Sequence, residues 1–107
     1  MALEPDRKKH KGFNGSAQRG AATRRVSARD GDRCSYCMLF LIGEAITIDH
    51  VIPLVSGGPH NIGNFVIACS PCNQAKGETS EVDFRASPFL LARRKMIEAQ
   101  DLESEEG

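Results

Sequence analysis

The sequence contains no tryptophan, a single tyrosine, no net charge and no long run of apolar residues. Because a membrane-spanning helix needs roughly 20 consecutive apolar residues, we expect no association with a membrane. The first seven residues, MALEPDR, also lack the apolar stretch of a secretory signal. We therefore expect a cytoplasmic protein, in whose reducing compartment structural disulfides are disfavoured.

The chain is short and leaves little room for a hydrophobic core. Its 107 residues fit one domain, and 40% of them are hydrophobic, an ordinary share for a globular protein. A domain of this size often needs a disulfide or a metal ion in addition to its core. Four cysteines are present, and with disulfides disfavoured they favour metal binding.

The balanced total charge hides an uneven distribution. Residues 1–33 carry nine basic and four acidic residues, whereas residues 96–107 carry five acidic residues and no lysine or arginine. A basic segment fits a polyanionic partner, although a solvated leader explains it equally well. We interpret residues 1–20 as a flexible basic arm, 21–103 as the folded domain with a C-terminal helix, and 104–107 as an acidic tail.

Turn residues and apolar periodicity divide the folded part into short elements. Alternating apolar and polar residues predict strands at 45–49 and 64–68. Helices are predicted at 21–30, 71–76 and 88–103, with Ser-Pro pairs at the start of the last two. The apolar face expected for the last helix consists of Phe89, Ala92, Met96 and Ala99. This mixture predicts an α+β fold.

The cysteines form two pairs of identical spacing, Cys34-x-x-Cys37 and Cys69-x-x-Cys72. A two-residue spacer lets both thiolates of a pair reach one ion, and two pairs complete a tetrahedral site that is closed to substrate. We therefore predict a structural zinc ion, whose binding contributes to folding. The alternatives are a rubredoxin-like iron site, a redox dithiol pair and buried free thiols. The glycines usual after iron-binding cysteines are missing, and no βαβ pattern supports a redox motif.

Polar residues cluster between the cysteine pairs and just after them. Asp49 and His50 close the first predicted strand, and Asn64 opens the second. Asn73 lies in the first turn of the helix that follows, beside a cysteine. The end of a strand and the start of a helix can face one another across a ββα hairpin. The pattern therefore predicts that these polar side chains form one site.

This pattern resembles the HNH endonuclease family, in the branch that carries a four-cysteine zinc site. The matching stretches are DHVIPL, the GG turn, Asn64 and CSPCNQAKG, and the lead-in RDGDRCSYC is similar to the segment preceding the motif in family members. The resemblance covers residues 24–77. It implies a small ββα-metal (His-Me finger) fold with a structural four-cysteine zinc site and flanking helices, and so a nuclease domain at 21–103.

The resemblance also implies a role for each matching residue. His50 would be the general base that activates water, and Asp49 and Asn73 would hold the catalytic metal. Asn64 would hold the loop between the strands by backbone hydrogen bonds and so orient His50. Asn73 replaces the histidine of many members, which makes this chain an H-N-N variant. An Asp/Asn oxygen pair suits Mg²⁺ or Mn²⁺ better than zinc, with Ni²⁺ or Zn²⁺ as alternatives.

The implied activity is the metal-dependent hydrolysis of phosphodiester bonds in DNA. Imidazole has an ordinary pKa of about 6.5 and accepts a proton near neutrality, while a metal ion neutralises phosphate charge. The expected contacts to nucleic acid are Lys76, Arg24, Arg25 and Arg29. Lys76 is equally well explained as a solvated lysine. His60 lies in a turn rich in Gly, Pro and Asn, where we expect an exposed side chain without a role.

Two other functions fit parts of the sequence. A zinc-stapled module could bind nucleic acid through the basic arm without cutting it, and such binding would weaken steeply with salt. An electron carrier would use the cysteines alone. Members of the family serve in restriction, homing, phage DNA packaging, RNA-guided cleavage and bacteriocins, and this short chain is similar to restriction-type and phage-type members. We expect a monomer or weak homodimer, so double-strand cleavage would need two subunits or two successive nicks.

Overall fold

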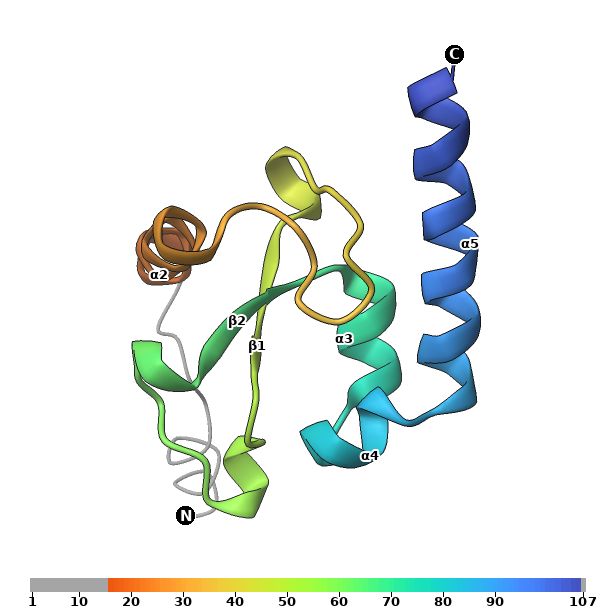
Figure 1. Ribbon diagram of the computed structural model, residues 1–107. Helices are drawn as coiled ribbons and strands as arrows, with labels where there is room; N and C mark the ends of the chain where they lie inside the picture. Colours follow the sequence, from red (N-terminus) through yellow and green to blue (C-terminus); the bar gives the residue numbers. More distant parts are fainter. Residues whose placement is uncertain (1–15, 107) are drawn as a thin grey trace, which may run out of the picture.

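The computed structural model describes residues 16–106. A two-stranded antiparallel sheet lies at the centre, with the helix Ser16–Asp30 on one side and the helices that follow the second strand on the other (Figure 1). The helices and strands are α2 (Ser16–Asp30), β1 (Thr47–His50), β2 (Phe65–Ala68), α3 (Ser70–Lys76), α4 (Glu81–Arg85) and α5 (Pro88–Glu106). Among the described residues, no helix combines the length and the apolar character of a membrane span.

The two strands and α3 form the predicted ββα unit. β1 pairs with β2 in a register that sets Thr47 opposite Ala68 and His50 opposite Phe65. α3 follows β2 directly and packs back against β1. The predicted α+β fold is therefore confirmed. The first strand is shorter than expected, because Gly43–Ala45 forms a 3-10 turn where an extended segment was predicted to begin.

Both ends of the described chain are more helical than expected. The predicted basic arm lies outside the described residues at positions 1–15, but residues 16–20 already belong to α2. At the other end α5 continues to Glu106, so most of the predicted acidic tail is helical. Alanine, glutamine, arginine and glutamate favour helix even where no apolar pattern is present. Apolar periodicity therefore placed both boundaries too close to the core.

The hydrophobic core surrounds the four cysteines. Its other fully buried members include Val26 from α2, Tyr36 from the loop after α2, Ile67 from β2 and Leu90 from α5. The ring of Tyr36 meets that of Phe84 edge to face, with 5.2 Å between the ring centroids. The core thus joins elements from both sides of the sheet around one small cluster.

The face by which α5 packs was predicted wrongly. Phe89, Ala92, Met96 and Ala99 are all exposed, whereas Leu90 and Ile97 are buried. Arg93 and Arg94 lie between these two on the same face, because positions i, i+3, i+4 and i+7 of a helix share one side. Long arginine side chains can cover apolar surface with their stems while their guanidinium groups remain hydrogen-bonded. Counting arginine as purely polar therefore concealed the true packing face.

We predict that Leu90→Ala lowers the free energy of unfolding by about 2–5 kcal/mol, because it leaves a cavity in the core. Its neighbour Leu91 is 51% exposed, and Leu91→Ala is the matched control, with an expected change below about 0.5 kcal/mol. Urea denaturation followed by circular dichroism measures both. Equal losses for the two variants would contradict the packing of α5 described above.

Candidate functional site

The four cysteines converge in the structure. The Sγ atoms of Cys34, Cys37, Cys69 and Cys72 all lie within 4.8 Å of one another, and all four residues are buried. The first pair lies in the loop after α2 and the second at the N-terminal end of α3, so both strands fall in the segment between them. The backbone amides of Tyr36 and Cys37 donate to Cys34 Sγ, each at 3.4 Å. This cluster can hold a metal ion such as zinc.

The protonation of the cluster also favours a bound cation. Burial raises the pKa of Cys72 to about 12. A hydrogen bond from Cys69 lowers the pKa of Cys34 to about 4. Crowded thiols in a buried site therefore do not ionise together without a compensating positive charge, and a divalent ion that binds thiolates provides it.

Arginines from α4 and α5 lie around the cysteine cluster, an arrangement that the sequence did not predict. Arg93 Nη2 donates to Cys69 Sγ at 3.5 Å, and Arg94 Nε donates to the carbonyl of Tyr36 at 2.6 Å. The guanidinium of Arg85 lies 4.8 Å from the centre of the Tyr36 ring. These contacts connect α4 and α5 to the cysteine cluster and place positive charge beside sulfur. In the sequence the same residues look like an ordinary solvated helix face.

Asp49 connects the cysteine cluster to the polar site. Its carboxylate is 6% exposed, and its Oδ2 accepts a hydrogen bond of 2.7 Å from the hydroxyl of Tyr36. The same oxygen lies 3.1 Å from Nζ of Lys76, and that Nζ also donates to the carbonyl of His50 at 3.1 Å. Both contacts with the carboxylate use Oδ2, so neither occupies Oδ1.

The structure corrects the expectation for Lys76. This side chain was expected either to contact phosphate or to be solvated, but it is 0% exposed and paired with Asp49. Its position four residues after Cys72 puts both on one face of α3, and that face packs against β1. This spacing is the signal in the sequence that could have predicted its burial.

His50 ends β1 between two other rings. Its Nε2 lies 3.0 Å from Nδ1 of His60, and the planes of the two imidazoles are 25° apart with 5.2 Å between ring centroids. The ring of Phe65 meets His50 edge to face at 4.9 Å. Burial lowers the pKa of His50, and the neighbouring His60 lowers it further, while Asp49 opposes the shift. A lowered pKa favours the neutral imidazole, which is the form that can accept a proton.

Asn64 holds the loop that connects the two strands. Its Oδ1 accepts from the amide of Ile52 at 2.9 Å, and its Nδ2 donates to the carbonyls of Ile52 and Pro59, both at 3.0 Å. The loop also folds tightly at Gly58, where an added Cβ would lie 1.9 Å from the carbonyl oxygen of Ile52. Only glycine fits there. These contacts set the path of the chain from His50 to His60.

Asn73 faces the same space as Asp49 and His50. Its Nδ2 donates to the carbonyl of Ile48 at 3.1 Å. Asp49, His50 and Asn73 line one pocket of about 270 Å³. His50 and Asn73 also border a second hollow of about 580 Å³, whose far wall includes Arg19 of α2. The structure thus brings three of the predicted residues to one pocket, and α2 borders the second hollow, which shares His50 and Asn73 with it.

The predicted nucleic-acid contacts on α2 differ from one another. Arg24 and Arg25 are exposed. Arg29 is exposed as well, but it donates to the carbonyl of Ile62 at 2.9 Å and to that of Phe65 at 2.7 Å. Arg29 therefore connects α2 to the start of β2, a structural role that the sequence did not predict.

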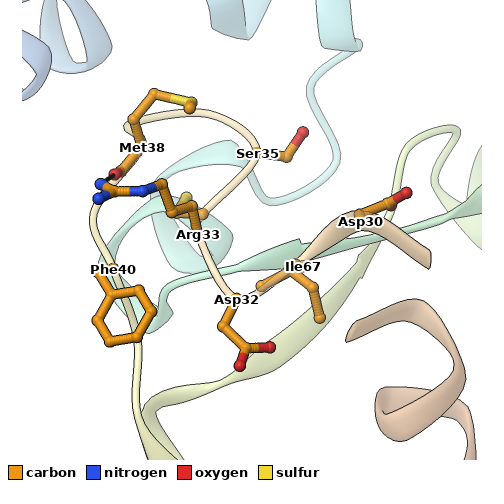
Figure 2. A pocket seen from close by; sticks show the side chains of 9 residues that line it. Asp30, Asp32, Arg33, Ser35, Met38, Phe40 and Ile67 are labelled. Atoms are coloured by element: carbon orange, nitrogen blue, oxygen red, sulfur yellow. Dashed lines mark hydrogen bonds between the residues drawn. The ribbon is translucent and has the colours of Figure 1, made fainter. Parts of the chain in front are cut away.

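A separate hollow lies beside the first cysteine pair (Figure 2). It has a volume of about 540 Å³, and its lining includes Arg33, Met38, Phe40 and Ile67. The guanidinium of Arg33 lies 5.8 Å from the centre of the Phe40 ring. His50, Asp49 and Asn73 are not among its lining residues, so this hollow is distinct from the polar site.

Comparison with known families agrees with the geometry. Residues 34–79 match the family model described as HNH endonuclease. The matched segment contains both cysteine pairs, the Asp-His pair and both asparagines of the site. The resemblance inferred from the motifs is therefore confirmed by a family match over this segment. Comparison with curated proteins finds no match.

We predict that Lys76→Met lowers the free energy of unfolding by about 3–5 kcal/mol, because it leaves a buried carboxylate without its cation. The matched control is Lys95→Met on the exposed side of α5, with an expected change within about 0.5 kcal/mol. Chemical denaturation measures both variants. Adding Asp49→Asn to Lys76→Met should recover part of the loss, since the unpaired charge is then removed. A Lys76→Met protein as stable as the control would contradict the buried pair.

Proposed function

We propose that this protein is a metal-dependent endonuclease that hydrolyses phosphodiester bonds in DNA. The observation that carries the proposal is the pocket shared by Asp49, His50 and Asn73. It lies within the segment that matches the HNH endonuclease family. A carboxylate, an imidazole and an amide at one pocket are suitable groups for holding a hard cation and for moving a proton.

The donor atoms available in this pocket fit Mg²⁺ or Mn²⁺. Asp49 directs Oδ2 to Tyr36 and Lys76, so Oδ1 is the oxygen for a metal. Asn73 uses Nδ2 for the carbonyl of Ile48, so its Oδ1 is the second candidate ligand. Carboxylate and amide oxygens are the ligands that hard cations prefer. When bound, such an ion neutralises charge on the scissile phosphate and stabilises the departing oxygen.

His50 acts in this proposal as the general base. The water oxygen attacks phosphorus, its proton passes to the imidazole, and the ester bond to the leaving oxygen breaks. Burial and the neighbouring His60 lower the pKa of His50, so the ring is neutral and able to accept that proton. The contact from Lys76 Nζ to the carbonyl of His50 fixes the backbone of the base relative to Asp49.

The cysteine cluster is proposed to bind a structural zinc ion. Four buried thiols whose sulfurs lie within 4.8 Å of one another suit a closed tetrahedral site. The ion would hold the loop that carries Tyr36 against the start of α3, and α3 carries Asn73 and Lys76. Zinc would therefore stabilise the fold that positions the site and would take no part in the hydrolysis.

We propose that bound DNA lies along α2 and extends from there to the pocket. Arg24 and Arg25 are exposed on this helix. Arg25 borders a hollow of about 360 Å³ together with His60 and Phe65, the two ring neighbours of His50. Basic side chains placed this close to the site can hold the phosphates that flank the scissile bond.

We predict that the purified protein nicks supercoiled plasmid when Mg²⁺, Mn²⁺ or Ni²⁺ is added, and that His50→Ala lowers the rate by about 10²-fold or more, since general-base catalysis contributes at least this much. Gln100→Ala, on the exposed side of α5, is the control and should keep the full rate. If the wild type is inactive with every metal but binds DNA with a steep dependence on salt, the chain is the non-catalytic binding module instead.

A second prediction concerns the cysteine cluster. Elemental analysis of the colourless purified protein should find one zinc per chain, and Cys69→Ser should strongly destabilise the fold, because a lost ligand weakens a site that a small core cannot replace. Ser70→Ala, at the exposed neighbouring position, is the control. Iron with visible colour would support an electron carrier, and a Cys69→Ser protein of unchanged stability would refute the structural role.

A further inference from the structure

The rings of His50 and His60 are in direct contact. Nε2 of His50 and Nδ1 of His60 are 3.0 Å apart, a hydrogen-bond distance. Two neutral imidazoles can form this bond only if one nitrogen carries the proton and the other offers its lone pair. The bond therefore couples the tautomers of the two rings, and two arrangements satisfy it.

Only one of the two arrangements suits a base at His50. If His60 Nδ1 is the acceptor, the proton of His50 lies on Nε2, and Nδ1 of His50 has the lone pair that takes a proton from water. If His60 Nδ1 is the donor, His50 is protonated on Nδ1 and its only lone pair is used in the bond. An outer partner that fixes the tautomer of a working histidine is common in hydrolytic and metal sites.

The loop presents His60 to His50 through contacts on both sides of it. The carbonyl of Pro59, directly before His60, accepts from Asn64 Nδ2 at 3.0 Å. Directly after His60, the Oδ1 of Asn61 accepts from the amide of Gly63 at 3.0 Å and caps the short 3-10 helix Ile62–Asn64. His60 is exposed, but hydrogen bonds hold the backbone on both sides of it. The conformation of the loop therefore places its ring against His50.

We propose that His60 is a positioning residue, which accepts a hydrogen bond from Nε2–H of His50 and so keeps His50 in the tautomer that acts as the base. The inference rests on the endonuclease activity proposed above. It assigns a task to a residue outside the Asp-His, Asn and Asn positions of the family motif. It also defines the course of the proton: water gives it to Nδ1 of His50, while the proton on Nε2 stays shared with His60.

Three substitutions separate this task from simple packing, because His60 also contacts the ring of Phe65 at 5.1 Å. His60→Asn retains an acceptor oxygen close to the position of Nδ1 but loses the ring. His60→Phe retains the ring but has no acceptor, and His60→Ala loses both. We expect His60→Asn to nick plasmid within about threefold of the wild-type rate, and the other two to lose about 10- to 100-fold, the usual cost of losing an outer partner.

The tautomer is measured directly, on full-length protein that has retained its metal. The ¹⁵N chemical shifts of the His50 ring should report protonation at Nε2 in the wild type and in His60→Asn, and a mixture of tautomers in His60→Phe. A fully active His60→Phe together with a weakened His60→Asn would show that packing is the only role and would overturn the inference.

The same measurement separates failure of this inference from failure of the proposed function. If the wild type cuts no DNA with any metal, the endonuclease proposal fails, and the ring shifts still test His60. An unchanged His50 tautomer in His60→Phe would then overturn the positioning role, whereas a changed tautomer would support it independently of activity.

Discussion

The arrangement of this small protein depends on one buried carboxylate. Oδ2 of Asp49 accepts a hydrogen bond from the hydroxyl of Tyr36 and pairs with the ammonium of Lys76. These two groups come from the segments of the chain that carry the two different cysteine pairs. Tyr36 stands between the cysteines of the first pair, and Lys76 ends the helix that begins with the second pair. A buried charge is costly unless it is paired and hydrogen-bonded. The carboxylate therefore ties the cysteine cluster, α3 and β1 into one unit, and displacing Tyr36 or Lys76 removes a partner of the buried charge.

Lys76 extends this unit to the proposed base. Its ammonium touches both Asp49 and the carbonyl of His50, so one cation sets the spacing between a proposed metal ligand and the backbone of the proposed base. Asn64 acts on the other side, where it fixes the loop that returns from His50 toward β2. The polar pocket is therefore a product of interior contacts, and its residues have little freedom to rearrange independently.

Local sequence patterns predicted much of this structure. Contacts between residues that lie far apart in the sequence could not be predicted from such patterns. The spacing of the cysteines, the two strands and the Asp-His and Asn positions could be found because each depends on a few neighbouring residues. The burial of Lys76 could be missed because a helix of seven residues gives barely two turns of periodicity. The pairing of His60 with His50 depends on the exact path of a loop, which no local pattern encodes. The packing face of α5 was concealed by arginines, whose stems are apolar and whose ends are charged.

The closeness of the two cysteine pairs has a further consequence for how this unit can be used. The segment with both strands, Asp49, His50 and Asn64 starts at one pair and ends at the other, and all four sulfurs lie within 4.8 Å of one another. The polypeptide thus enters and leaves this segment at nearly the same place. Units whose ends lie together can be inserted into the surface loops of unrelated proteins with little disturbance of either partner. The two ends of the segment from the first cysteine to α3 are accordingly placed as an inserted unit requires, while Val26 of α2 and Leu90 of α5 complete the core around the cysteines.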